Sequence, residues 1–252
     1  LLHSEGIVYG DISPENIFVS ESTDTVWLID SDNLRHVLNF NKTIITQGYT
    51  APELYKNIST NTLFSDSYSF ARLAFQVLTM VSPFEGNLAD SDESGWDSDG
   101  VDFYEQIEKG EIPWIGDYSD NSNYTEKGIP MDIVLNQDLK NLFEKTLGNC
   151  GRKEPMERGT MSEWYSVLSK TVNLTATCPK CGFSYYNYSN TCPICFSKIP
   201  SIVNIGVFKS FLLNEDVDEK PELVEQDRFK LCYDNSPKFI KYSDIFPLLT
   251  GE

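Results

Sequence analysis

The sequence predicts an α+β chain in which a mainly helical region with a short β-hairpin precedes a small four-cysteine zinc ribbon and a β-rich tail. Three observations lead to this fold class. Apolar residues recur at helical spacing between residues 66 and 168, four of the six cysteines cluster, and strand-like runs follow residue 200. The predicted domains are 1–172, 173–200 and 201–252, and we expect the last to be incomplete.

The composition is that of a globular protein with a strong negative charge. Among 252 residues, 20 Lys and Arg stand against 38 Asp and Glu, which gives a net charge of −18. This charge disfavours nucleic acid and anionic membranes as partners. The sequence holds no apolar run of about 18 residues that could span a bilayer, and its start carries no signal-peptide pattern. We therefore expect a cytoplasmic protein without a membrane partner.

A β-hairpin is predicted near the start of the chain. Two short apolar runs flank a polar turn: Ile17–Val19 and Val26–Ile29. Carboxylates and an amide stand at the ends of these runs away from the turn, with Asp11 and Asn16 before the first run and Asp30 and Asp32 after the second. We expect these oxygen-bearing side chains to converge at one end of the hairpin.

Amphipathic helices are predicted after the hairpin. Their apolar residues recur at spacings of three and four in three segments: 66–81, 139–147 and 164–168. Ser65 or Asp66 is the expected cap of the first, Gly148 ends the second, and a Thr160–Glu163 capping box opens the third. Residues 85–102 hold seven acids and no Lys or Arg, which is typical of a solvated loop and, alternatively, of an acidic docking patch.

Two cysteine pairs have the spacing of a zinc site. Cys178 and Cys181 form one CPxC turn, and Cys192 and Cys195 form another. Two such turns can complete a tetrahedral shell of four sulfur atoms around Zn²⁺, which leaves no open coordination position and makes the metal structural. The alternatives are disulfides or a redox CxxC motif, and the missing secretory signal favours zinc. After this module, strands are expected at 202–213 and 229–246, separated by an acidic turn at 214–227.

The segment from Leu2 to Ile17, LHSEGIVYGDISPENI, resembles the catalytic loop of the protein-kinase superfamily. Further matches follow in the family's order. They are Asp30 after the hairpin, residues 48–53, which resemble the end of the activation segment, residues 65–70, which resemble the start of the central buried helix, and Arg158. The resemblance covers about residues 1–172 and implies the C-terminal lobe of a kinase. It also implies that Asp66 accepts hydrogen bonds from the catalytic loop and that Arg158 pairs with Glu53.

The resemblance assigns chemistry to three residues. It implies that Asp11 orients the substrate hydroxyl as the catalytic base, and that Asn16 and Asp30 hold the Mg²⁺ ions that accompany ATP. The chemistry accounts for this residue set, because a phosphoryl group in transit carries charge that cations must neutralise beside the nucleophile.

Three departures separate this sequence from most kinases. Tyr9-Gly10 replaces the His-Arg pair before the base, Ser13 replaces a lysine, and Asp30-Ser31-Asp32 replaces Asp-Phe-Gly. With the zinc ribbon, these features are similar to an atypical bacterial kinase group that includes tellurite-resistance-associated and helix-hairpin-helix-linked kinases.

The replacement of arginine by Gly10 bears on regulation. Without that arginine we expect no control by phosphorylation of the activation segment, and a smaller effect of alanine at Thr46 or Thr50 than of losing Asp11 or Asp30. The Gly-rich nucleotide loop and its partner Lys and Glu are not found in the sequence. We therefore expect a fragment that lacks the N-terminal lobe and, by itself, shows no kinase activity and binds Mg-ATP weakly.

The predicted function is ATP-dependent phosphoryl transfer to a Ser or Thr hydroxyl of a protein substrate by the intact parent protein. ATP, Mg²⁺ and Zn²⁺ are the expected cofactors. The alternative is a pseudokinase scaffold whose zinc ribbon and tail recruit partners. Retention of Asp11, Asn16 and Asp30 favours catalysis, because a scaffold has no need of a metal-binding set. A nucleic-acid-binding ribbon ranks last, because residues 178–200 hold only two cations, Lys180 and Lys198.

Overall fold

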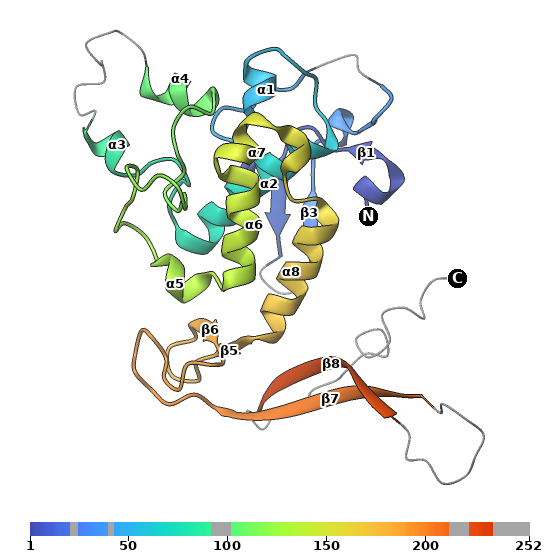
Figure 1. Ribbon diagram of the computed structural model, residues 1–252, viewed down its shortest axis with the longest axis vertical. Coiled ribbons are helices and arrows are strands. Elements are labelled where there is room, and N and C mark those ends of the chain that lie inside the picture. The colour runs from blue at the N-terminus through green and yellow to red at the C-terminus, as the bar shows by residue number, and fades with distance from the viewer. Residues whose placement is uncertain (21–24, 40–42, 92–101, 212–221, 234–252) are drawn as a thin grey trace. The chain divides into compact units, whose positions relative to one another are not determined.

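The computed structural model describes residues 1–20, 25–39, 43–91, 102–211 and 222–233. The chain divides into two compact units, Leu1–Leu168 and Ser169–Glu252. The first unit is mainly helical with small sheets, and the second holds the four-cysteine cluster and two β-hairpins (Figure 1). The predicted fold class is confirmed.

Helix α2 (Leu63–Thr79) is the longest of the described helices. A capping box starts it, because Thr62 Oγ1 accepts a hydrogen bond from Ser65 N and Ser65 Oγ accepts one from Thr62 N. The expected cap at Ser65 or Asp66 was therefore wrong, because the helix is capped about one turn earlier, at Thr62. In this box a serine occupies the third helical position, where Glu or Gln is usual. Met80, at φ +63°, ends the helix in the left-handed conformation.

The core of the first unit packs α2 against α6 (Gln137–Leu147) and α8 (Met161–Asn173). Phe75 lies edge-on to Trp114 and Phe143, with ring centroids 5.6 and 5.3 Å apart, and Phe143 lies 4.9 Å from Trp164. All four rings are buried. Edge-to-face pairs of this kind add to the stabilisation that burial itself gives.

The remaining helices of the first unit are short. They are α1 (Pro52–Tyr55), α3 (Asn87–Ser91), α4 (Phe103–Glu108), α5 (Met131–Val134), α7 (Asn149–Lys153) and the 3-10 turns His3–Glu5, Pro14–Asn16, Ser31–Asn33 and Pro155–Glu157. Of the predicted acidic loop at 85–102, residues 92–101 lie outside the described residues. The capping box of α8 is confirmed, since Thr160 N donates to Glu163 Oε2 at 2.7 Å and Glu163 N donates to Thr160 Oγ1 at 3.2 Å.

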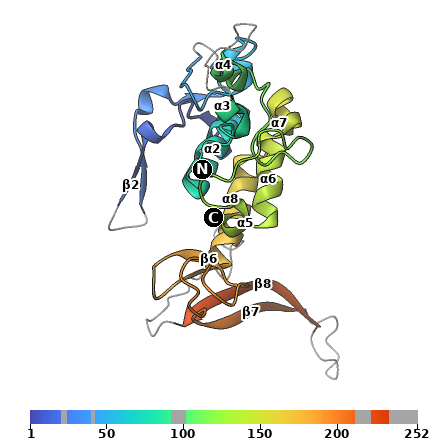
Figure 2. The same cartoon turned by 90° about the vertical axis from the view of Figure 1, so that its left-hand side faces the viewer.

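The predicted hairpin is present. Strand β2 (Ile17–Val19) pairs antiparallel with β3 (Val26–Leu28), and β1 (Ile7–Val8) pairs with β4 (Arg35–His36). Figure 2 shows the β2–β3 hairpin on one side of α2, with α6 on the other. The two small sheets bring the segments before and after the hairpin together at one end of it.

The second unit contains two antiparallel hairpins. Strands β5 (Thr175–Thr177) and β6 (Ser184–Tyr186) belong to the cysteine module, and β7 (Ser201–Phe211) pairs with β8 (Glu222–Tyr233) along their whole lengths. The first tail strand was predicted well. The second begins at Glu222, inside the predicted acidic turn, because ladder pairing with β7 outweighs the low strand preference of acidic residues. Residues 234–246 lie outside the described part of the chain.

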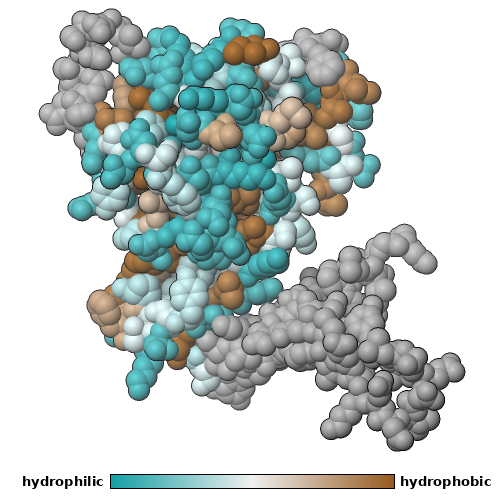
Figure 3. Space-filling model, viewed as in Figure 1, coloured by the Kyte–Doolittle hydropathy of each residue, from teal (hydrophilic) through white to brown (hydrophobic). Residues whose placement is uncertain are grey.

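The surface is consistent with the high charge. Figure 3 shows a largely hydrophilic face on which apolar side chains gather in separate patches. Within the described ranges, no helix is both long and apolar enough to cross a membrane.

Candidate active site and metal centre

The loop that carries Asp11 is fixed by two buried side chains. Asp66, at the start of α2, accepts hydrogen bonds from Tyr9 N at 2.7 Å and Gly10 N at 2.9 Å, as the resemblance implies. Asn61 Nδ2 donates to Gly10 O at 3.0 Å, and Asn61 Oδ1 accepts from Ile44 N at 2.7 Å. The loop and the activation segment are therefore joined through Asn61.

Gly10 has a conformational reason to be glycine. Its φ of +83° lies in the left-handed region, which glycine adopts without steric cost. A Cβ at this position would lie 3.6 Å from Arg35 Nη2. Strand β4 therefore places Arg35 beside the loop, although Gly10 replaces the arginine that most kinases have at this position.

Asp11 is held by the side chains of two neighbours. Asn16 Nδ2 donates to the Asp11 backbone carbonyl at 3.0 Å, which orients the Asn16 amide. Thr46 Oγ1 donates to Asp11 Oδ1. Thr46 therefore contacts the predicted base directly, a role that the expectation from the sequence did not include.

Asn33 connects the two predicted acidic site residues. Its Nδ2 lies 3.5 Å from Asp11 Oδ2 and 3.3 Å from Asp30 Oδ2. The two carboxylate oxygens thus cannot be more than about 7 Å apart, a separation that Mg²⁺ ions can bridge. Asp30 itself stands at φ +59°, a conformation that costs energy for a residue with a Cβ and is often found at functional sites.

Tyr9 lies beneath this cluster. Its hydroxyl donates to Ile29 O and lies 3.4 Å from Asn16 O. It therefore contacts the residue before the first strand of the hairpin and the residue after the second. Burial raises the pKa of Tyr9, and the nearby carboxylates of Asp11, Asp30 and Asp66 raise it further. The phenol therefore stays protonated at neutral pH and serves as a hydrogen-bond donor.

A buried ion pair anchors the segment that follows. Arg158 Nη1 and Nη2 each donate to one oxygen of Glu53 at 2.7 Å, and the guanidinium lies 4.7 Å from the centroid of the Tyr68 ring. Glu53 opens α1, so this pair fixes the end of the activation segment as the resemblance implies.

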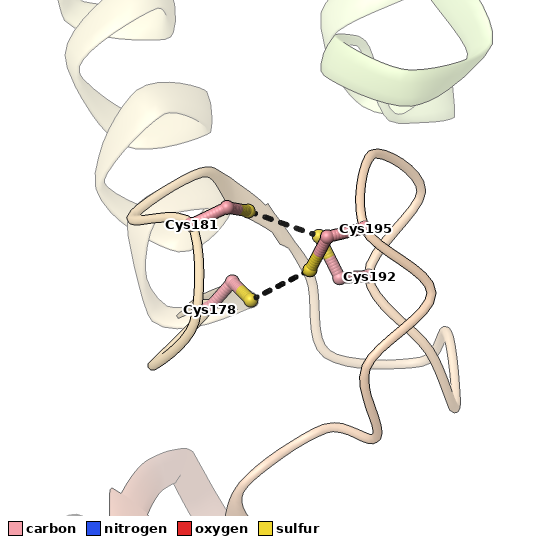
Figure 4. Close-up of side chains that lie close together, drawn as sticks. All are labelled: Cys178, Cys181, Cys192 and Cys195. Carbon is pink, nitrogen blue, oxygen red and sulfur yellow. Dashed lines mark hydrogen bonds between the residues drawn. The ribbon is translucent and has the colours of Figure 1, made fainter.

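The four clustered cysteines converge in the second unit (Figure 4). The ligand atoms of Cys178, Cys181, Cys192 and Cys195 all lie within 4.8 Å of one another. Two sulfur pairs are separated by 3.5 and 3.6 Å. Those distances are far longer than the about 2.05 Å of a disulfide and close to the about 3.8 Å edge of a tetrahedral Zn–S₄ shell. The donor set and its geometry therefore fit Zn²⁺.

Ser197 supports the thiolate form of two of these cysteines. Its Oγ lies 3.1 Å from the sulfur atoms of both Cys178 and Cys195. This contact, the largest of several, lowers the pKa of Cys178 to about 6. Since the thiolate is the metal-binding form, the serine favours metal binding by the cluster.

Comparison with known proteins settles the family. A model of the protein kinase domain matches residues 1–167, which are about two thirds of the chain. The chain belongs to the protein kinase family. A kinase domain implies ATP and Mg²⁺ as cofactors, and the oxygen ligands gathered around Asn33 fit that implication.

Curated kinases resemble part of this kinase chain. The serine/threonine-protein kinase pkn2 of Myxococcus xanthus is 31% identical over 97 residues, and ribosomal protein S6 kinase alpha-3 of Mus musculus is 35% identical over 88 residues. Each match covers 34% of this chain and 12% of the relative, so the chain spans about an eighth of these relatives' length. The solved structure of the Cydia pomonella granulovirus kinase PK-1 is 16% identical, with a TM-score of 0.42, and covers 64% of this chain and 50% of that one.

Sequence reasoning missed four residues around the kinase site: Asn33, Arg35, Thr46 and Asn61. Each acts through a contact between segments that are distant in sequence. Asn33 offered a partial signal, since it lies three residues after Asp30 in a segment already marked as acidic. Asn61 offered none, because one buried amide between two loops leaves no pattern in the sequence.

Proposed function

We propose that the intact parent protein is a Ser/Thr protein kinase and that this chain is its C-terminal lobe. The observation that carries the proposal is the position of Asn33, whose single amide nitrogen joins the carboxylates of Asp11 and Asp30. A base and a metal ligand must stand side by side for phosphoryl transfer, and a binding scaffold does not need them together.

Each side chain of the cluster has a distinct proposed role. Asp11 orients the attacking hydroxyl and accepts its proton, while Thr46 holds one oxygen of the Asp11 carboxylate in place. Asn16 and Asp30 would hold the metal ions. Bound Mg-ATP would supply the phosphoryl group and the cations that neutralise its charge.

Two residues bear on the departures of this site from most kinases. Ser13 is buried, with 1% of its surface exposed, so the loop position that holds a lysine in most kinases presents no cation here. Arg35 lies beside Gly10 and keeps a positive group near the loop.

Phosphoryl transfer by the parent protein tests the proposal. We expect Asp11→Asn and Asp30→Asn each to lower kcat by about a thousandfold or more, because each removes several kcal/mol of transition-state stabilisation. Asp138→Asn, an exposed acid on α6, serves as the matched control and should leave kcat unchanged. The assay follows transfer of labelled γ-phosphate from ATP to protein Ser and Thr.

The pseudokinase scaffold is the competing outcome. It would replace our proposal if the intact protein binds ATP, transfers no phosphate to itself or to candidate proteins, and keeps its partner binding when Asp30 is changed to Asn. Recruitment would then rest on the cysteine module and the tail.

A further inference from the structure

A second buried ion pair contacts the activation segment. Arg72 of α2 and Glu108 of α4 are 3% and 6% exposed, and Arg72 Nη1 donates to Glu108 Oε1 at 3.3 Å. Each partner also bonds the backbone of the segment. Glu108 Oε1 accepts from Gly48 N at 3.1 Å, and Arg72 Nη1 donates to Thr50 O at 3.5 Å. Two helices that are distant in sequence therefore hold the same turn.

This turn, residues 46–50, is closed by its own hydrogen bonds. Thr50 Oγ1 accepts from Thr46 N at 2.9 Å and donates to Thr46 O at 2.8 Å, and Thr50 N donates to the same carbonyl at 3.1 Å. The first residue of the turn is thus bonded to the last. A displacement of the groups that the ion pair holds, Gly48 N and Thr50 O, therefore also displaces Thr46.

The first residue of the turn contacts the predicted base. Thr46 Oγ1 donates to Asp11 Oδ1. A continuous series of hydrogen bonds and backbone thus leads from Glu108 through Gly48 and Thr46 to Asp11. Since small displacements of a reacting group lower the rate of a reaction strongly, the position of this turn bears on the reaction at Asp11.

The geometry of the ion pair is poor for stability alone. Arg72 and Glu108 make one contact of 3.3 Å, whereas Arg158 and Glu53 make two parallel contacts of 2.7 Å. Arg72 Nε and Glu108 Oε2 have no hydrogen-bond partner among the described residues. Burial of two charges costs free energy, and neutral side chains of similar size often serve a core equally well. The backbone groups that the pair holds explain its presence better than a contribution to the core does.

We propose that Arg72 and Glu108 are a positioning pair for phosphoryl transfer. Glu108 holds the Gly48 N–H, Arg72 keeps the buried carboxylate of Glu108 charged and in place, and the turn 46–50 thereby keeps Thr46 on Asp11. The inference rests on the proposed function for the reaction that is affected. It adds two residues that act through Thr46 and not by contact with the reacting atoms.

Two matched double variants separate the contact with Gly48 from the buried charge. Arg72→Met/Glu108→Gln removes both charges and keeps a side-chain oxygen that can accept from the Gly48 N–H. Arg72→Met/Glu108→Met removes both charges and that oxygen. Both replacements at position 108 are unbranched and have similar helix propensity. We expect both variants to fold, because neutral side chains replace the whole ion pair and leave no unpaired charge.

Hydrogen exchange of the 252-residue chain tests the contact without any catalysis. We expect the Gly48 amide to exchange about tenfold faster in the variant with Glu108→Met than in the variant with Glu108→Gln, because only the first loses the acceptor. Amides in the middle of α2 and α6 should exchange equally in both variants. Equal exchange of the Gly48 amide in the two variants would overturn the proposal.

The kinetics of the parent protein test whether the pair acts through Thr46. We expect Arg72→Met/Glu108→Met to lower kcat about tenfold and Arg72→Met/Glu108→Gln to lower it less than about twofold. The loss is limited because Ser69 Oγ still donates to Tyr49 O, at 2.8 Å, and keeps the turn on α2.

The decisive comparison repeats both double variants together with Thr46→Val. If the pair acts through the Thr46 hydroxyl, kcat should then be the same in both, since residues that act as one unit are not additive. Independent, multiplying losses would overturn the proposal, as would equal kcat values of the two double variants when Thr46 is present.

An ion pair within α4 provides the control. Lys109 Nζ lies 2.7 Å from Glu105 Oε1, and both side chains are partly exposed. Lys109→Gln/Glu105→Gln removes two opposite charges from the same helix and leaves Glu108 unchanged. We expect kcat and the exchange of the Gly48 amide to stay the same.

The positioning pair and the kinase proposal fail in different ways. If the parent transfers no phosphate in any form, but the Gly48 amide loses protection only with Glu108→Met, the kinase proposal falls and the hold of Glu108 on the turn stands. If the parent transfers phosphate equally well in both double variants, the kinase proposal stands and the positioning pair falls.

Discussion

Different interactions stabilise the two units of the chain, each within itself. In the described residues of the first unit, seventeen buried apolar side chains form one core, whereas the cysteine module has a cluster of three, two of which are the ligand candidates Cys178 and Cys192. A module this small cannot bury enough apolar surface to offset the entropy of folding. We therefore expect metal ligation to substitute for a core in the cysteine module, whereas the first unit is stabilised by its buried apolar side chains.

Removal of zinc should produce the largest difference in stability between the cysteine module and the first unit. We expect the chain to bind one Zn²⁺, and Cys192→Ser or a chelator to unfold the module, because structural zinc contributes on the order of 10 kcal/mol to such sites. All four tryptophans lie in the first unit, at positions 27, 96, 114 and 164, so tryptophan fluorescence should not change. Loss of the near-UV signal of Tyr185 and Tyr186 would report the module.

Cys150→Ser is the control for that experiment, because Cys150 is exposed and lies outside the cluster. A purified chain without zinc, or a disulfide among the four cysteines under reducing conditions, would contradict the assignment. A tryptophan signal that changes with chelation would show that the two units do not fold independently.

The reverse experiment destabilises the first unit and leaves the cysteine module intact. Glu53→Gln leaves the Arg158 guanidinium buried without its counter-ion, and we expect the free energy of unfolding of this unit to fall by about 3–5 kcal/mol. Denaturant unfolding followed by tryptophan fluorescence measures the loss, while zinc binding should be unchanged.

A surface ion pair provides the comparison for Glu53. Asp132 pairs with Lys140 and is 89% exposed, so Asp132→Asn should cost less than about 1 kcal/mol. Equal losses from the two substitutions would mean that the buried pair is no more important than the exposed one.

The sequence made the cysteine module easier to predict than the kinase site. Two CxxC pairs determine a local geometry, and the capping box of α8 is likewise complete within four residues. The kinase motifs located Asp11, Asn16 and Asp30, but Asn33, Thr46 and Asn61 depend on how distant segments pack. The cap of α2 was misplaced for a similar reason: Asp66, the better capping residue by type, is used to hold the catalytic loop.

Substitution of Thr46 tests whether the activity of the site can be lowered without lowering the stability of the core. Thr46→Val removes the hydroxyl that donates to Asp11 and keeps the side-chain shape. In the parent protein we expect kcat to fall about tenfold, near 1.4 kcal/mol, with little change in thermal stability. Thr43→Val, in the same segment, is the control, and an equal loss there would remove the specific role of Thr46.

The smallest expected effect is on zinc affinity and comes from a difference between the two cysteine turns. Gly182 and Phe196 each lie four residues after the first cysteine of a pair, and their N–H groups donate to the carbonyls of Cys178 and Cys192 at 2.9 and 3.0 Å. Both adopt left-handed backbone, at φ +75° and +57°. That conformation suits glycine and costs about 1–2 kcal/mol for other residues.

Phe196→Gly should therefore stabilise the zinc-bound module slightly. The phenyl ring is 78% exposed, so its removal forfeits little burial, and the relief of strain exceeds the added flexibility of glycine by less than about 1 kcal/mol. Competition with a chromophoric chelator should show zinc held up to about fivefold more tightly. Gly182→Ala, which introduces the same strain into the other turn, should loosen zinc by a comparable factor. Weaker zinc binding by the glycine variant would show that contacts of the Phe196 ring outweigh the cost of its backbone conformation.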